Sequence, residues 1–206
     1  MATSRFLLLG NIDDGHRTEE LIRALIARAQ VRTPLAGAHP VLLIDSPGGE
    51  IGPALAIYSA ARLIPDLQTV VIGECHSAAI LPFMAGAEGY RIVMPHSTFL
   101  LHAPMKALEG PQGEQSLQAE VGLLRAHTAT FRDIIRNVAD RTTGKDSWEL
   151  AAALERPEFT LFTAIDAKRL GLATIGVFGV LLEAKKRSLI AGVLPLVDRL
   201  VKELKS

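Results

Sequence analysis

The fold is decided by the stretch from Thr69 to Gly86, which reads TVVIGECHSAAILPFMAG. Its apolar, β-branched start predicts a buried strand over Thr69–Ile72, and its apolar end predicts a short helix that closes near Gly86. The segment between them, Gly73 to Ser77, predicts a tight turn from the strand into the helix. This order of elements is the repeating unit of α/β proteins.

Two earlier segments of the chain have the same strand–turn–helix order. A strand over Phe6–Leu9 precedes a helix over Thr18–Gln30, and a strand over Val41–Ile44 precedes a helix from Pro53 to Ile64. All three strands are short and apolar without alternation, which is typical of a sheet buried on both faces. We therefore expect an α/β fold with parallel strands and covering helices.

The chain beyond Gly86 predicts further strands and helices. Arg91–Met94 and Thr98–Leu101 have strand patterns, and a long amphipathic helix follows the polar loop that ends at Glu114. Thr163 and Asp166 are spaced as a capping box at the start of a later helix. A strand-like run over Ile175–Leu182 and an amphipathic segment end the chain, with no linker that would mark a second domain.

The composition excludes several classes of protein. The 206 residues are 49% hydrophobic and carry 22 basic and 22 acidic side chains, which argues against disorder and against a broadly basic nucleic-acid surface. The first residues lack the pattern of a signal peptide, and the longest uncharged apolar-rich stretch, Ala78–Ala87, is too short to cross a bilayer. We expect a cytoplasmic protein with no nucleic-acid partner and no membrane partner.

Metal and cofactor sites have little support in the sequence. None of the six histidines has the spacing of a helical metal motif, and the glycines at 48, 49 and 52 do not form the pattern of a dinucleotide-binding turn. The lone Cys75 excludes an intramolecular disulfide, and it fits a packed thiol better than a nucleophile. We expect no metal and no cofactor.

Ser77 is the candidate nucleophile that the local pattern offers. It lies where a buried strand turns into a helix, whose unpaired N–H groups suit a developing oxyanion. The same position suits an ordinary helix N-cap, and the local sequence alone favours that simpler role. His102, which follows the strand Thr98–Leu101, is in the same way either a general base or a structural histidine.

Six segments in consistent order over residues 5–173 together resemble the proteolytic subunit of the Clp protease. Two of them correspond to the family's catalytic segments: GECHSAA around Ser77, and RIVMPHSTFLLHAP around His102. The others are LGNIDD up to Asp14, IDSPGG followed by ALAIY, the loop and long helix from Gly110, and FTAIDAKRLGL up to Leu172.

The resemblance implies a ClpP/crotonase-like α/β fold, a superhelix of repeated strand–turn–helix (ββα) units with a protruding strand–helix handle over about residues 103–140. The peptidase domain then comprises residues 1–174, and residues 175–206 add a strand and an amphipathic helix to the same domain. The resemblance makes Ser77 the nucleophile and His102 the general base. It places the backbone N–H groups of Gly49 and Ala78 in the oxyanion hole.

The activity implied by the resemblance is that of a serine endopeptidase. Its substrates would be peptides or unfolded proteins, cleaved through an acyl-enzyme inside an oligomeric chamber. The family's members assemble as heptameric rings, joined face to face, so we expect a homo-oligomer. The resemblance also implies an AAA+ ATPase as a partner that feeds the chamber, and a relative of narrow specificity that acts without an ATPase is equally compatible with the sequence.

One departure from the family concerns its third catalytic residue, an aspartate that follows an arginine. The matching stretch here is Glu155-Arg156-Pro157-Glu158, so that proline stands where the aspartate is expected. Glu158 or Glu155 could orient His102 instead, or the site is a Ser–His pair assisted by a water or a backbone carbonyl. Loss of the orienting carboxylate costs about 10⁴ in turnover in a serine protease, so a slow enzyme is expected.

Two other functions are compatible with the sequence. The missing aspartate would suit a catalytically inactive ring subunit of the same family. A crotonase-type acyl-CoA enzyme has a similar architecture and oxyanion hole, but it would need no serine nucleophile. The requirement for the Ser77 hydroxyl therefore separates the peptidase from both alternatives.

Overall fold

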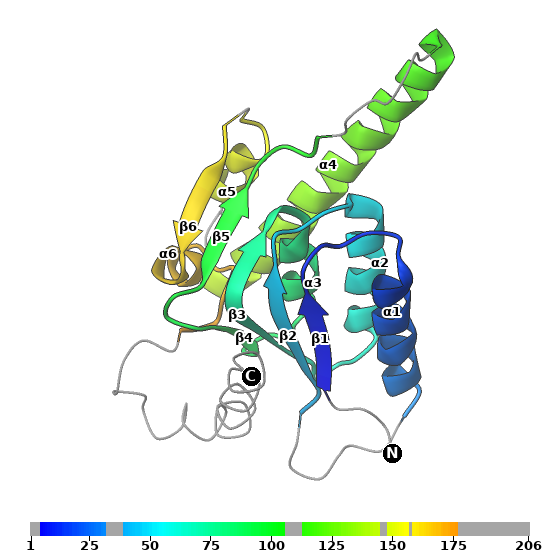
Figure 1. Ribbon diagram of the computed structural model, residues 1–206. Helices are drawn as coiled ribbons and strands as arrows, with labels where there is room; N and C mark the ends of the chain where they lie inside the picture. The colour runs from blue at the N-terminus through cyan, green and yellow to red at the C-terminus, as the bar shows by residue number, and fades with distance from the viewer. Residues whose placement is uncertain (1–4, 32–38, 106–112, 145–147, 157, 177–206) are drawn as a thin grey trace.

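The computed structural model describes residues 5–31, 39–105, 113–144, 148–156 and 158–176, and within them seven strands form one sheet (Figure 1). The strands are β1 (Arg5–Leu9), β2 (Val41–Ser46), β3 (Gln68–His76), β4 (Arg91–Val93), β5 (Thr98–Leu101), β6 (Thr160–Thr163) and β7 (Ile175–Gly176). The helices are α1 (His16–Ala29), α2 (Ile51–Arg62), the 3₁₀ turn η1 (Ser77–Ala79), α3 (Ile80–Met84), α4 (Glu114–Thr143), α5 (Trp148–Ala153) and α6 (Ala164–Arg169).

The sheet is parallel except where β6 joins it. Its main path runs β1-β2-β3-β4-β7, and every pair of strands along this path is parallel. Strand β5 pairs in parallel with the end of β3, and β6 pairs antiparallel with β5. The predicted α/β architecture with a parallel-dominated sheet is thereby confirmed.

Strand β3 is longer than the sequence predicts, because it has two partners on one side. Its first half pairs with β4, and its last residues, Glu74 to His76, pair with β5. The prediction of a turn over Gly73–Ser77 is therefore wrong for Gly73 to His76, which continue the strand. The backbone groups of β5 stabilise this extension, and the local sequence pattern carries no information about them.

The helix boundaries follow the predicted signals, with two corrections at the starts of helices. Helix α1 begins at His16 instead of Thr18, with Gly15 as its N-cap. Helix α2 begins at Ile51 instead of Pro53, with Glu50 as its N-cap. Pro53 still lies in the first turn, where a missing N–H removes no helical hydrogen bond. The predicted capping box of α6 is confirmed: the Asp166 N–H donates to Thr163 Oγ1 at 3.3 Å, and the Thr163 N–H donates to Asp166 Oδ2 at 3.1 Å.

The predicted C-terminal strand is confirmed only at its start. Ile175 and Gly176 form β7 and pair with β4, whereas the rest of the run to Leu182 and the amphipathic segment that follows lie outside the described residues. None of the described helices has both the length and the hydropathy that crossing a membrane requires.

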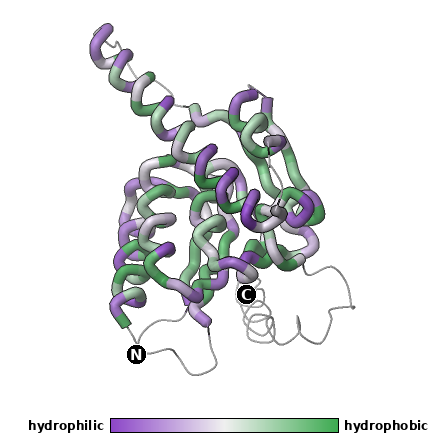
Figure 2. Tube along the Cα trace, turned by 180° about the vertical axis from the view of Figure 1, so that it is seen from behind, coloured by the Kyte–Doolittle hydropathy of each residue, from purple (hydrophilic) through white to green (hydrophobic). Residues whose placement is uncertain are grey.

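The main core lies between the sheet and the helices α1, α2 and α3, and it continues into α4, α5 and α6. Leu42, Leu43 and Ile44 of β2 are all fully buried, as predicted for a strand covered on both faces. Apolar positions of the tube gather between the helices and the strands, whereas polar positions follow the outer turns (Figure 2). The first turns of α4 project beyond the rest of the described chain (Figure 1).

Arg91 is a buried cation that connects three parts of the fold. It is 2% exposed, and its guanidinium donates to the carbonyl oxygens of Leu172 at 2.8 Å and Gly171 at 3.3 Å, and to Thr142 Oγ1. These bonds join β4 to the end of α4 and to the turn after α6. Burial lowers the pKa of Arg91 from its ordinary value to about 10, so the guanidinium stays protonated at neutral pH.

We expect Arg91→Met to lower the free energy of unfolding by about 3 kcal/mol, because it leaves buried carbonyl groups without donors. Arg91→Lys, which keeps the charge but loses the planar fork of donors, should show a smaller loss. Urea unfolding followed by circular dichroism measures both. A loss below about 1 kcal/mol for the methionine variant would contradict the stabilising role of Arg91.

Candidate active site

Ser77 lies at the junction between β3 and η1, in a backbone conformation that side chains rarely adopt. Its φ of +51° is the only positive φ of a non-glycine residue in the described part of the chain. Such a conformation costs of order 1–3 kcal/mol and is concentrated at functional sites. The N-cap of η1 is His76, not Ser77, so the simpler prediction that Ser77 is an N-cap is wrong.

The two residues before Ser77 point into different surroundings. Cys75 is fully buried, and its thiol donates to the Ala79 carbonyl oxygen at 3.5 Å. Burial raises the pKa of the Cys75 thiol well above its ordinary value, as expected for a packed cysteine and not for a nucleophile. His76 is partly exposed, and its Nε2 lies 2.9 Å from Thr98 Oγ1 on the neighbouring strand β5.

Gly48 and Gly49 bring a second backbone segment against the Ser77 turn. Both have positive φ, +94° and +141°, which strongly favours glycine. A Cβ on Gly48 would lie 2.6 Å from the His76 carbonyl oxygen and 2.8 Å from Ser77 Cβ, so only a glycine allows this approach. The segment is held by Ile12, whose N–H donates to the Gly48 carbonyl at 2.8 Å and whose carbonyl accepts the Glu50 N–H at 2.8 Å.

The pairing of β3 with β5 brings Ser77 and His102 to the same edge of the sheet. The last pair in this parallel register is His76 with Leu100. Ser77 directly follows β3, and His102 directly follows β5, on strands about 4.8 Å apart. Two residues that α3, β4 and β5 separate in the sequence thus lie at the ends of adjacent strands.

The hydrogen bond of His102 defines its tautomer. Nδ1 lies 2.7 Å from the carbonyl oxygen of Ala103, and because a carbonyl only accepts, Nδ1 carries the proton. The neutral ring then has its lone pair on Nε2, the nitrogen that takes a proton from a serine hydroxyl in a serine protease. Within the described residues, Nε2 has no hydrogen bond to Ser77 or to another group, and such bonds often tighten only when substrate binds.

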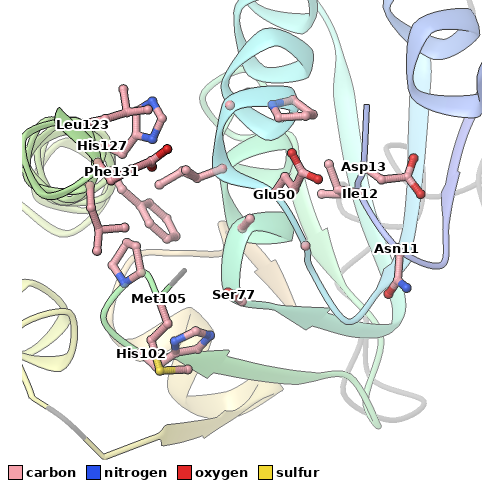
Figure 3. A pocket seen from close by; sticks show the side chains of 18 residues that line it. Asn11, Ile12, Asp13, Glu50, Ser77, His102, Met105, Leu123, His127 and Phe131 are labelled. Atoms are coloured by element: carbon pink, nitrogen blue, oxygen red, sulfur yellow. The ribbon is translucent and has the colours of Figure 1, made fainter. Parts of the chain in front are cut away.

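A cleft of about 840 Å³ joins these parts. Ser77, Ala78, Gly49 and His102 all line it, so the structure places the four predicted site residues in one cavity. Helix α4, seen end-on in Figure 3, brings Leu123, His127 and Phe131 to one side, and the segments after β1 and before α2 bring Ile12, Asp13 and Glu50 to the other.

Within the described residues, neither of the two carboxylates considered from the sequence forms a hydrogen bond or an ion pair with His102. Glu155 pairs with Arg132 of α4 at 3.0 Å, and Glu158 is exposed. Pro157, where the aspartate was expected, lies outside the described residues. The described neighbour of the imidazole is Phe159, whose ring centroid lies 5.0 Å from that of His102 at an interplanar angle of 72°.

The sequence did not predict Phe159 as a site residue, and the pairing of β5 with β6 is what identifies it. Strand β6 was not expected from the sequence, and its antiparallel register pairs Leu101 with Thr160. One step further along both strands places His102 opposite Phe159. Only the register between two strands far apart in the sequence identifies this neighbour.

Comparisons with known proteins agree with the architecture and cover all of the described residues. The model of the Clp protease family matches residues 4–176. The chain is 33% identical over 132 residues to the ATP-dependent Clp protease proteolytic subunit 1 of Thermobifida fusca, covering 64% of this chain and 56% of that protein. It is 30% identical over 177 residues to the Clp proteolytic subunit of Citrus sinensis, covering 85% of each chain. For proteolytic subunit 1 of Corynebacterium glutamicum the identity is 30% over 173 residues, covering 82% and 76%.

Proposed function

The chain belongs to the Clp protease family and is a serine-type peptidase, and on this premise we propose that it cleaves peptides or unfolded protein segments through an acyl-enzyme on Ser77. Ser77 Oγ attacks the peptide carbonyl carbon while His102 Nε2 accepts the hydroxyl proton. His102 then returns this proton to the leaving amine. A water molecule, deprotonated by the same nitrogen, hydrolyses the ester and frees Ser77.

The oxyanion of each tetrahedral intermediate is bound by the N–H groups of Gly49 and Ala78. Support comes from the hydrogen bonds of the glycine segment. The Gly48 carbonyl accepts the Ile12 N–H, and the peptide group that joins Gly48 to Gly49 is trans, so its N–H, on Gly49, points away from Ile12. The Ala78 N–H lies in the first turn of η1, where no preceding helical carbonyl is available to it.

The observation that carries this proposal is the conformation and position of Ser77. A serine held at a φ of +51° between strand and helix, in the same cleft as a histidine of the required tautomer, is the arrangement of a nucleophile turn. An ordinary structural serine needs neither the strained backbone nor the close approach of Gly48.

The proposed domain and assembly are those usual in this family. The peptidase domain comprises residues 1–174, a superhelix of strand–turn–helix units whose protruding handle is residues 103–140 with α4. The proposed extension of the same domain over residues 175–206 lies, apart from Ile175 and Gly176, outside the described residues. The chain forms heptameric rings that stack face to face in the cytoplasm and enclose the cleft. An AAA+ ATPase delivers unfolded substrates. Support for an ATPase partner comes from the relatives, whose names describe those proteins as ATP-dependent.

A second candidate, an inactive ring subunit, is favoured by one observation: the described neighbour of His102 is an aromatic ring instead of a carboxylate. Both candidates predict the same fold and assembly. They differ in whether Ser77 reacts.

Labelling with a fluorophosphonate tests the proposal, since such probes react with activated serines. We expect a single adduct on Ser77 by peptide mass spectrometry of the assembled protein, and strongly reduced labelling in His102→Ala. Ser59→Ala, which removes a hydroxyl that bonds the Leu55 carbonyl within α2, is the control and should label like the wild type. An assembled, folded sample without the Ser77 adduct would contradict the peptidase mechanism and support the inactive subunit.

A further inference from the structure

We propose that Phe159 is a positioning residue of the active site and that, together with the Ala103 carbonyl, it performs the orienting task that a carboxylate performs in a Ser-His-Asp triad. This inference rests on the proposed function, because it concerns how His102 is held for proton transfer. It goes beyond that function by assigning a task to an aromatic side chain that the reaction itself does not require.

The first argument is the strand register. Leu101 of β5 pairs with Thr160 of β6, so the residues that follow and precede this pair, His102 and Phe159, lie opposite each other. Cross-strand neighbours of this kind have Cβ atoms about 4.5–5.5 Å apart. Residue 159, directly before β6, is therefore the position from which a side chain can support the imidazole.

The second argument is the geometry of the two rings. Their centroids are 5.0 Å apart and their planes cross at 72°, an edge-to-face arrangement that is favourable for aromatic pairs. The Phe159 side chain restricts rotation of the imidazole about its side-chain bonds. Phe159 is nevertheless 61% exposed, so burial in the core of this chain does not explain its position.

The third argument concerns what the Ala103 carbonyl can and cannot do. As acceptor of the Nδ1–H at 2.7 Å, it fixes the tautomer, which is one task of the triad carboxylate. It carries no charge, so it stabilises the imidazolium formed during proton transfer less than a carboxylate would. Orientation is thus supplied by Phe159 and Ala103, and the electrostatic part is missing.

Five variants at one position test this assignment in the full-length assembled protein: Phe159→Ala, Phe159→Leu, Phe159→Tyr, Phe159→Asn and Phe159→Asp. The readouts are kcat and KM for a fluorogenic peptide and the rate of fluorophosphonate labelling. Alanine removes the ring, and we expect kcat to fall roughly 2- to 10-fold with KM little changed. The kcat of Phe159→Leu should fall nearly as far as that of Phe159→Ala, whereas Phe159→Tyr, which keeps the ring, should retain the wild-type kcat.

Comparing Phe159→Asp with Phe159→Asn separates the effect of a negative charge from the effect of side-chain shape, because the two side chains have nearly the same shape. Aspartate places an anionic acceptor opposite the imidazole, and we expect kcat to rise about tenfold or more above the asparagine variant. A carboxylate also favours the protonated imidazole, so the acid limb of the kcat/KM profile should move to higher pH in the aspartate variant only. The other titratable groups of the cleft, Asp13, Glu50, Glu120 and His127, are common to both variants.

The outcomes test the positioning role of Phe159 separately from the peptidase mechanism. If wild-type protein forms the Ser77 adduct but Phe159→Ala keeps wild-type kcat, or Phe159→Asp is no faster than Phe159→Asn, the positioning role is overturned and the peptidase mechanism stands. If wild-type protein forms no adduct, both fall. Should the aspartate variant fail to assemble, the comparison of alanine with tyrosine decides alone.

Discussion

Replacing Ser77 with alanine is expected to lower kcat for peptide hydrolysis by about 10⁴-fold or more, the largest effect that any single substitution in this chain should have. The reason is that in the proposed mechanism the Ser77 hydroxyl oxygen becomes acylated, and no other described serine lines the cleft. A fluorogenic peptide assay over a range of concentrations gives kcat and KM separately. KM should change little, because alanine fills no new space in the cleft.

The result is interpretable only if the variant folds and assembles. Removing the hydroxyl leaves the strained φ of +51° unchanged, so circular dichroism and the assembly size should match those of the wild type. Ser59→Ala, on the far part of α2, is the matched control and should keep full activity. Activity that survives in Ser77→Ala would contradict the acyl-enzyme mechanism and would favour a crotonase-type reaction, in which the oxyanion hole acts without a serine nucleophile.

Gly49→Ala is expected to lower kcat by about 10²- to 10³-fold, the usual cost of losing one oxyanion donor. A Cβ at this position would collide with the Ile12 carbonyl oxygen, and the φ of +141° is unfavourable for any side chain. The segment must therefore shift, and its N–H moves away from the carbonyl oxygen of the substrate. Because the donor bonds the oxyanion more strongly than the ground-state carbonyl, the loss should appear in kcat more than in KM.

A matched control keeps this second prediction specific. Gly122→Ala lies within α4, has open space at its Cβ and should leave kcat unchanged, since alanine favours a helix. Urea unfolding of both variants separates misfolding from loss of the donor. A Gly49→Ala protein that assembles normally and retains more than half of the wild-type kcat would show that Gly49 does not bind the oxyanion.

Local sequence signals predicted most of the elements that position this site. The uninterrupted apolar run of β2 predicted a strand buried on both faces, and Leu42, Leu43 and Ile44 are fully buried. Thr163 and Asp166 predicted the start of α6, because a capping box is formed by residues three positions apart. Such signals depend on neighbours in the sequence, and the sequence therefore contains them completely.

The candidate site was predicted in part. The order of the segments gave Ser77, His102, Gly49 and Ala78, and all four line one cleft. The continuation of β3 to His76 and the existence of β6 were missed, because both depend on hydrogen bonds to β5. The carboxylates considered for His102 were chosen by position along the chain, whereas its described ring neighbour is Phe159.

The amino-acid sequence by itself determined the alternation of strands and helices, the family, and the identity of the serine and histidine. Only the tertiary structure decided that Ser77 has left-handed backbone, that the proton of His102 lies on Nδ1, and that an aromatic ring faces the imidazole. The physical reason is the range of the interactions. Periodicity, capping and turn formation act over a few residues, whereas strand register is fixed by pairing between segments about sixty residues apart, and a shift by one residue would give His102 a different neighbour.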